Sequence, residues 1–341
     1  MKRILLLHTG GTLGMVPLKT GKQLKPAALA GEVFKYIPEA LQLAEIDVRM
    51  IYNIDSSNVQ ISHWQLLAST IEQEMDNYDG FVIIHGTDTM VYTASALSFA
   101  LMNLPKPVIL TGAQRPIAEI RTDAKSNLVN SIEMATYDIP EVGLYFNNQL
   151  FRGNRAKKIS IDQFDAFASP NYPHLASVGL KIQIHHGSIR RPTGLFRVQK
   201  EFADQVLILR LFPGMSPEYL LPLLDSSIEA FLIEGFGAGN VPVLEKSLIP
   251  FIERATEKKK IVALSSQSFE GSVDLELYEC GTLAAQAGAI SCGDMTTEAA
   301  AVKMMFLLGQ FEDTLKVKKN LNLPLAGEVT RKFARRAQDR E

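Results

Sequence analysis

Two short segments of the chain place threonines directly after apolar runs. The first, HTGGT, covers residues 8–12 after RILLL, and the second, HGTDT, covers residues 85–89 after GFVII. A threonine hydroxyl can act as a nucleophile when a base or an acidifying group lies beside it. Continuous apolar runs are typical of buried strands in α/β sheets, which bind ligands at their carboxyl ends. We therefore expect Thr12, Thr87 and Asp88 to meet in one crevice.

The glycines of the first segment allow three interpretations: a phosphate-binding loop, a plain turn, or a turn that presents a nucleophile. Gly10 and Gly11 permit the tight turn that each of these requires. TGGTLGM lacks the lysine of a Walker loop, and GGTLG misses the G-x-G-x-x-G spacing of dinucleotide-binding turns. In the second segment, Asp88 or Thr89 fits a plain helix cap. Because capping alone does not predict two such segments, we favour catalysis.

A threonine nucleophile needs a nearby group that accepts its proton. His8 and His85 precede the two turns, so we expect them to point into the sheet or to pair with backbone. A lysine can accept the proton when it is desolvated beside a hydroxyl. Lys157 and Lys158 follow a later apolar run and would lie at the same edge of the sheet. Adjacent lysines are more often solvated surface, and spacing alone does not decide between these roles.

The elements that would hold these residues alternate between apolar runs and amphipathic segments. The expected strands cover residues 3–8, 46–52, 80–85, 107–112, 142–146, 205–212, 228–236 and 260–266. Segments 62–77, 89–105 and 123–140 are expected to be helical, the first beginning at a Ser62 cap. Its apolar residues fall on one helical face: Trp64, Leu67, Ala68, Ile71 and Met75.

This alternation predicts an α/β fold with a mainly parallel sheet that is covered on both faces. The strand rhythm weakens after residue 182 and restarts at 205. We therefore expect a larger N-terminal domain over 1–182, which carries the threonine segments. A linker over 183–204 and a smaller α/β C-terminal domain over 205–341 would follow.

Composition excludes several functional classes. The chain has 341 residues and a formal net charge of −2, which does not favour nucleic acid or a membrane surface as a partner. Cys280 and Cys292 are too few for a disulfide framework and do not fit a zinc pattern. We expect neither a signal peptide nor a membrane span, and hence a cytoplasmic enzyme without a metal ion. The tail 330–341 is expected to be the solvated end of a helix.

Nine motifs together resemble those of a known family: HTGGTLGM, DSSN, HGTDTM, LTGAQRP, TDAKSNL, FRGNRAKK, FDAFASPN, GFGAGNVP and GDMTTEA. They are similar to the bacterial-type asparaginases, and specifically to the cytoplasmic type I branch. The resemblance implies a flavodoxin-like larger domain and a smaller C-terminal domain. It also implies a homodimer or a homotetramer with active sites between subunits. The implied reaction is hydrolysis of L-asparagine to L-aspartate and ammonia, without metal or cofactor.

The resemblance also implies roles for individual residues. Thr12 corresponds to the nucleophile, which would form a β-aspartyl ester. Thr87, Asp88 and Lys158 correspond to the groups that align and deprotonate the water that hydrolyses this ester. The residues implied in substrate binding are Asp55, Ser56, Ser57, Thr87, Asp88 and Asn240, the last reaching the site from a partner subunit.

The chain departs from the family pattern at two places. The family commonly has a tyrosine in the loop after T-G-G-T, whereas this chain has Lys22 near that place and no tyrosine before Tyr36. Tyr278 would supply an activating phenol from the C-terminal domain, or it is an ordinary packed tyrosine. Glu234 and Ser268 occupy the positions where some type I members use an arginine and a cysteine for regulation. We therefore expect hyperbolic kinetics.

Three alternatives to an asparaginase stay open. The first is a dual glutaminase-asparaginase, although Ser57, where the periplasmic branch usually carries glutamine, favours the shorter substrate. The second is the amidase subunit of a tRNA amidotransferase, which we do not expect of a chain that begins at its first strand. The third is a catalytically silent sensor that binds asparagine or aspartate, for which the missing loop tyrosine is the supporting feature.

Overall fold

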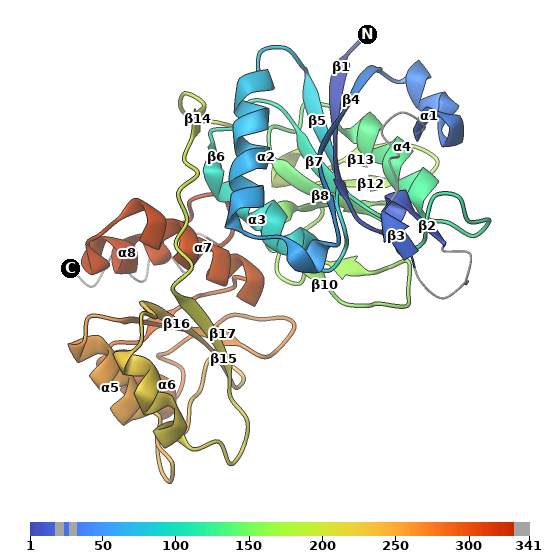
Figure 1. Ribbon diagram of the computed structural model, residues 1–341. Helices are drawn as coiled ribbons and strands as arrows, with labels where there is room; N and C mark the ends of the chain where they lie inside the picture. The colour runs from blue at the N-terminus through green and yellow to red at the C-terminus, as the bar shows by residue number, and fades with distance from the viewer. Residues whose placement is uncertain (18–23, 27–32, 331–341) are drawn as a thin grey trace. The chain divides into compact units, whose positions relative to one another are not determined.

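The computed structural model divides into two compact units, Met1–Lys200 and Glu201–Glu341. It describes residues 1–17, 24–26 and 33–330 (Figure 1). Lys22 and the tail beyond Thr330, which carried two of the expectations above, lie outside the described residues. Strand β14 (Arg197–Val198) pairs with β6 (Leu101–Met102) and places the stretch up to Lys200 in the first unit. The predicted linker over 183–204 thus contains a strand, and its limits stay a prediction.

The first unit contains an eight-stranded sheet in the order β13-β12-β9-β8-β7-β5-β1-β4. These strands are β1 (Arg3–Gly10), β4 (Glu45–Ile54), β5 (Gly80–Ile84), β7 (Val108–Thr111), β8 (Val142–Phe146), β9 (Gln149–Arg152), β12 (Ala176–Val178) and β13 (Ile182–Ile184). The strands from β4 to β8 are parallel, whereas β9, β12 and β13 add antiparallel strands at one edge. In chain order the parallel strands read 2-1-3-4-5, which is the flavodoxin-like arrangement.

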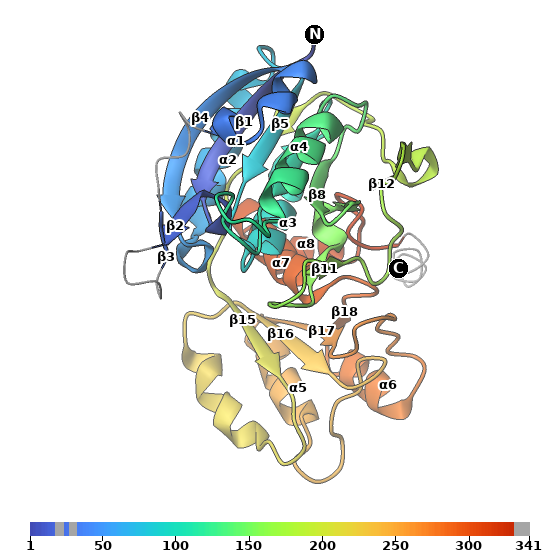
Figure 2. The same ribbon diagram turned by 90° about the vertical axis from the view of Figure 1, so that its right-hand side faces the viewer.

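Helices cover both faces of this sheet (Figure 2). They are α1 (Val33–Tyr36), α2 (Ile61–Glu74), α3 (Met90–Ala100) and α4 (Ala124–Met134). The apolar residues predicted for one face of α2 are all buried, which confirms that amphipathic pattern. The predicted Ser62 cap is wrong, because Gln60 is the N-cap and exchanges hydrogen bonds with His63 in a capping box.

Short elements connect these larger ones. The 3-10 helices are η1 (Thr12–Gly14), η2 (Pro38–Gln42), η3 (Ser56–Asn58), η4 (Gly153–Arg155), η5 (His186–Ser188) and, in the second unit, η6 (Pro217–Asp225). Two small hairpin pairs complete the first unit: β2 (Met15–Pro17) with β3 (Leu24–Pro26), and β10 (Lys157–Lys158) with β11 (Phe167–Ala168). The second of these pairs carries the candidate lysine.

The second unit is a smaller α/β domain with a parallel sheet in the order β15-β16-β17-β18. Its elements are β15 (Val206–Arg210), β16 (Ala230–Gly235), β17 (Ile261–Ser266), β18 (Ile290–Ser291), α5 (Ile249–Glu257), α6 (Glu279–Gln286), α7 (Thr297–Gln310) and α8 (Thr314–Leu321). An apolar cluster that includes Phe231, Ile233, Phe251 and Leu264 forms its core. The two-unit α/β architecture confirms the predicted fold class.

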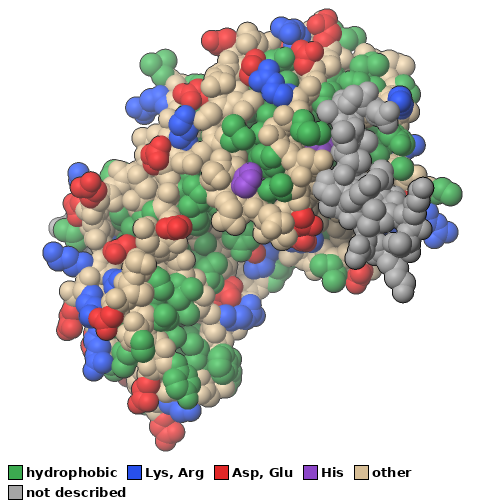
Figure 3. Space-filling model, in the orientation of Figure 1, with side chains coloured by type: hydrophobic (Ala, Val, Ile, Leu, Met, Phe, Trp, Pro, Cys, Tyr) green, Lys and Arg blue, Asp and Glu red, His purple; other side chains and the backbone are tan. Residues whose placement is uncertain are grey.

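The surface is mixed in charge. On the face drawn in Figure 3, basic and acidic side chains are interspersed, as a net charge of −2 leads one to expect. Within residues 1–17, 24–26 and 33–330, no helix has both the length and the apolar character needed to cross a bilayer.

Candidate active site

The two threonine segments meet where the strand order reverses. Strands β1 and β5 are parallel neighbours, so Thr12 and Thr87 follow them at the same edge of the sheet. Gly11 has a φ of 84°, and a Cβ on it would lie 2.5 Å from the backbone nitrogen of Gly86. Glycine is therefore required for the two turns to approach so closely. A crevice at this switch point is where open α/β sheets bind ligands.

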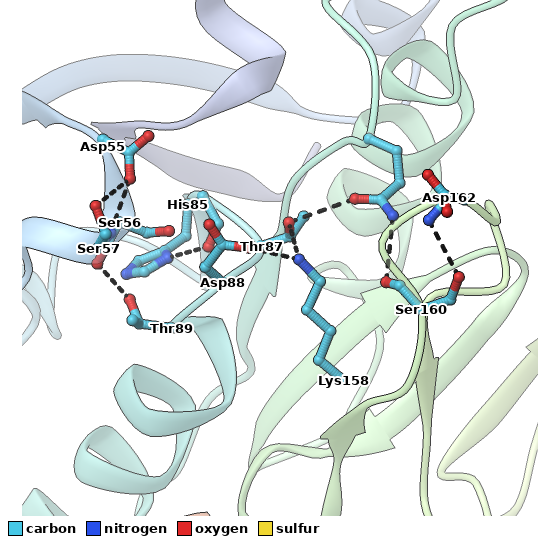
Figure 4. Close-up of polar contacts among 12 residues, drawn as sticks. Asp55, Ser56, Ser57, His85, Thr87, Asp88, Thr89, Lys158, Ser160 and Asp162 are labelled. Atoms are coloured by element: carbon cyan, nitrogen blue, oxygen red, sulfur yellow. Dashed lines mark hydrogen bonds and ion pairs between the residues drawn. The ribbon is translucent and has the colours of Figure 1, made fainter.

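A third turn, after β4, brings Ser56 to the same place. A Cβ on Gly86 would lie 2.6 Å from the Ser56 hydroxyl oxygen, so the side chain packs directly on this glycine. The Thr89 hydroxyl donates to the Ser56 carbonyl oxygen at 2.7 Å and ties the turn to the start of α3 (Figure 4). Three separate strand ends thus contribute to one site.

Asp55 begins this third turn and is held by its neighbour Ser57. The Ser57 hydroxyl donates to Asp55 Oδ1 at 2.7 Å, and the Ser57 backbone N–H donates to the same atom at 2.9 Å. These two hydrogen bonds lower the pKa of Asp55, so the carboxylate is favoured in its charged form. The Ser57 side chain is exposed, and its hydroxyl donates to Asp55. Direct contact between Ser57 and a ligand therefore stays a prediction from the sequence.

Hairpin β10–β11 supplies the amine. Lys158 Nζ lies 2.8 Å from Thr87 Oγ1 and 2.6 Å from Asp88 Oδ1, as Figure 4 shows. Successive side chains of a strand point to opposite faces, so only one of the two adjacent lysines can reach this site. The structure brings Lys158 together with Thr87 and Asp88. The spacing of the two lysines in the sequence did not decide whether either of them lies at the site or on the solvated surface.

These turns enclose a cavity of about 220 Å³. That volume suits a ligand smaller than a drug-sized molecule. Its lining consists of Gly11, Thr12, Asp55, Ser56, Gly86, Thr87, Asp88, Gln114, Lys158 and Ile161. All four residues predicted to be catalytic are in this lining. Within the described residues, no group of three or more His, Cys, Asp or Glu side chains is placed to hold a metal ion.

Sequence reasoning missed two lining residues, Gln114 and Ile161. Gln114 follows β7, the neighbour of β5 in the sheet, so its position after an apolar run was a usable signal. Ile161 lies in the loop of the β10–β11 hairpin, and its side chain is largely exposed. Nothing in its local sequence indicates contact with the cavity.

The two histidines pair with backbone groups of the turns, as predicted. His85 Nδ1 donates to the Gly86 carbonyl oxygen at 2.7 Å, and its Nε2 lies 2.9 Å from the Thr93 hydroxyl. The Gly10 backbone N–H donates to His8 Nδ1 at 3.2 Å. Burial lowers the pKa of each histidine to about 4, so both are neutral near pH 7.

Asn240 and Tyr278 belong to the second unit. Asn240 forms a backbone bridge with Phe236 after β16, and its buried Oδ1 has no hydrogen-bond partner among the described residues. Tyr278 is 53% exposed at the start of α6. The roles of both residues at the cavity remain predictions. Glu234 accepts a hydrogen bond from Thr297 at 2.8 Å, and the expectation of hyperbolic kinetics is likewise untested.

Comparison with known proteins agrees with this geometry. Family models match both units: "Asparaginase, N-terminal" over residues 3–190, and "Glutaminase/Asparaginase C-terminal domain" over residues 205–321. The chain belongs to the asparaginase family. Its residues are 38% identical to L-asparaginase 1 of Escherichia coli over 96% of this chain and 98% of that protein. The predicted resemblance to type I asparaginases is confirmed.

Two solved asparaginase structures also match the chain. L-asparaginase I from Vibrio cholerae has a TM-score of 0.88 and 38% identity, covering 96% of this chain and 99% of that one. The probable cytoplasmic L-asparaginase from Campylobacter jejuni has a TM-score of 0.78 and 27% identity, covering 94% and 99%. The asparaginase fold therefore extends over both units.

Proposed function

We propose that this chain hydrolyses L-asparagine to L-aspartate and ammonia through a covalent β-aspartyl ester on Thr12. The observation that carries the proposal is the cavity that Thr12 shares with Thr87, Asp88 and Lys158. The family match and the L-asparaginases among its relatives support the same reaction. A cytoplasmic location agrees with the description of the Campylobacter jejuni relative.

The first half-reaction transfers the aspartyl group to the enzyme. The Thr12 oxygen attacks the side-chain amide carbon, the carbon–nitrogen bond breaks, and ammonia leaves with the hydroxyl proton. Gly11 and Thr87 both line the cavity, and their backbone N–H groups would stabilise the oxyanion. One such donor contributes about 3 to 4 kcal/mol to transition-state stabilisation.

The second half-reaction uses the Thr87–Lys158–Asp88 array. A water attacks the ester carbon, the bond to Thr12 breaks, and the Thr12 oxygen regains a proton. Thr87 aligns this water by accepting a hydrogen bond from it, and Lys158, whose Nζ lies 2.8 Å from Thr87 Oγ1, accepts the water's proton directly. Asp88, 2.6 Å from the same amine, stabilises the positive charge that Lys158 then carries.

Charged and polar groups around the cavity fit the α-amino acid head of the substrate. The Asp88 side chain is 62% exposed, so it can accept a hydrogen bond from the α-ammonium group while Lys158 contacts its Oδ1. Asp55 adds a second carboxylate, and Ser56 adds a buried hydroxyl. Asn240 of a partner subunit completes the site in a homodimer or homotetramer. Unpaired polar groups would penalise a substrate that lacks this head.

Ammonia release from asparagine tests the proposal. We expect Thr12→Ala to lose at least about 100-fold in kcat, because no other group forms the ester. Thr193→Ala, the same change at an exposed position of the first unit, is the matched control and should retain the wild-type rate. Unchanged turnover in Thr12→Ala would remove this threonine from the mechanism.

The same assay separates the alternatives. Equal turnover of glutamine would identify a dual glutaminase-asparaginase. Binding of asparagine by calorimetry without any ammonia release would identify a sensor and refute the proposed activity.

A further inference from the structure

Gln114 lies in the cavity lining, and the mechanism above gives it no role. Its backbone is held firmly. The buried Asp123 carboxylate accepts hydrogen bonds from the Gln114 N–H at 2.9 and 3.1 Å and from the Arg115 N–H at 3.1 Å. Asn127 donates from Nδ2 both to Asp123, at 3.1 Å, and to the Gly112 carbonyl oxygen, at 3.0 Å. The turn after β7 therefore presents the Gln114 side chain from a rigid base.

The Gln114 side chain bridges two other parts of the site. Its Nε2 donates to the carbonyl oxygens of Gln163 at 3.2 Å and Ser160 at 3.4 Å, both in the loop of the hairpin that carries Lys158. These two acceptors require the amide nitrogen to face the hairpin, which turns the amide oxygen toward Thr87. Thr87 Oγ1 lies 3.4 Å from Gln114 Oε1 and donates to it.

This arrangement decides how the Thr87 hydroxyl is oriented. A hydroxyl has one hydrogen to donate and two lone pairs that accept. Gln114 takes the hydrogen, and the Lys158 amine donates to one lone pair at 2.8 Å. The remaining lone pair is available to accept a hydrogen bond from a water in the cavity.

We propose that Gln114 is a positioning residue for the second half-reaction. It turns the Thr87 O–H away from the attacking water, so that a lone pair of Oγ1 accepts the water's hydrogen. It also secures the hairpin loop next to Lys158. The inference rests on the proposed function, because it presupposes an ester on Thr12.

The role can be tested without unfolding the protein. Gln163 is exposed and Ser160 is half-buried, so water can replace Gln114 at both carbonyl oxygens when its side chain is changed. Gln114→Met keeps the length of the side chain and removes its hydrogen bonds. Gln163→Met makes the same change on an exposed side chain of the same hairpin and serves as the matched control.

We expect Gln114→Met to lower kcat for ammonia release by about 10- to 100-fold, since misplacement of a reacting group by about 1 Å costs this much. KM should fall by about the same factor, so that kcat/KM stays within about threefold, because kcat/KM reports only the steps up to the ester. Intact-mass spectrometry after acid quenching should show an aspartyl adduct that accumulates in Gln114→Met and not in the wild type. Gln163→Met should match the wild type in all three measurements.

Three results would overturn the inference: equal kcat in the two methionine variants, a rise in KM with unchanged kcat, or a lower kcat without the adduct. If Gln114→Met does not fold, Gln114→Asn replaces it, because its amide is one carbon too short for the bridge. The same outcomes are then expected. A wild-type protein without ammonia release refutes the proposed function instead, so the two failures are distinguishable.

Discussion

Replacing Lys158 with methionine removes the amine from the array, and we expect the fold to stay intact. The ion pair with Asp88 is 2.6 Å long, but the Asp88 side chain is 62% exposed and the Lys158 side chain 16% exposed. A pair open to water on one side contributes only about 0 to 1 kcal/mol to the free energy of unfolding. We therefore expect Lys158→Met to change that free energy by less than about 1 kcal/mol.

The effect on catalysis should be much larger. A positioned general base contributes about 10²- to 10⁴-fold, which corresponds to about 2.7 to 5.5 kcal/mol in the transition state. We expect Lys158→Met to lower kcat for ammonia release by about 10²- to 10⁴-fold, because the water aligned by Thr87 loses its proton acceptor. A large loss of kcat with a small change in the free energy of unfolding would indicate a catalytic role for Lys158 rather than a structural one.

The assay compares Lys158→Met with Lys157→Met, which makes the same change one residue earlier on the opposite face of the strand. Ammonia release and urea unfolding are measured for both variants and for the wild type. Lys157→Met should retain kcat within about twofold. A loss of less than tenfold in Lys158→Met would refute the reasoning, and so would a loss of stability large enough to explain the inactivity.

Two further substitutions test the close approach of the two threonine turns and the buried ion pair of the second unit. Gly11→Ala should lower the free energy of unfolding by at least about 2 kcal/mol and remove most activity, because Gly11 has a φ of 84° and a Cβ there would lie 2.5 Å from the Gly86 nitrogen. Urea unfolding measures the loss of stability. Gly187→Ala is the control, because a Cβ on Gly187 would meet open space. Glu328→Gln should destabilise the chain by about 3 to 5 kcal/mol, because it leaves the fully buried Lys303 without its ion pair. Burial alone would raise the pKa of Glu328, but Lys303 and the backbone hydrogen bonds outweigh it, so the pKa is lowered. The stabilisation by this carboxylate is therefore present near neutral pH and is lost on acidification. If acidification lowered the melting temperature of Glu328→Gln as much as that of the wild type, this prediction would be contradicted.

The sequence by itself determined the elements and the edge of the sheet at which the chemistry lies. Continuous apolar runs and helical periodicity are local properties, so they predicted the parallel strands and the buried face of α2. Because parallel strands end at one edge, the order of strands and turns along the chain also predicted that Thr12 and Thr87 lie together. The motifs that resemble the asparaginases added the substrate class, and the family match confirmed the resemblance.

Only the tertiary structure decided which neighbours take part. The pairing of β10 with β11 selects Lys158 rather than Lys157, since a strand shows alternate faces. Chain entry into α2 places the cap at Gln60 rather than Ser62. Gln114 reaches Thr87 because Asp123, nine residues later in the chain, holds its backbone. The selection of Lys158 and the contact of Gln114 with Thr87 depend on segments that lie apart in the chain, and the free energy of such contacts has no signature in local composition. The Gln60–His63 capping box is a local feature that the sequence analysis missed.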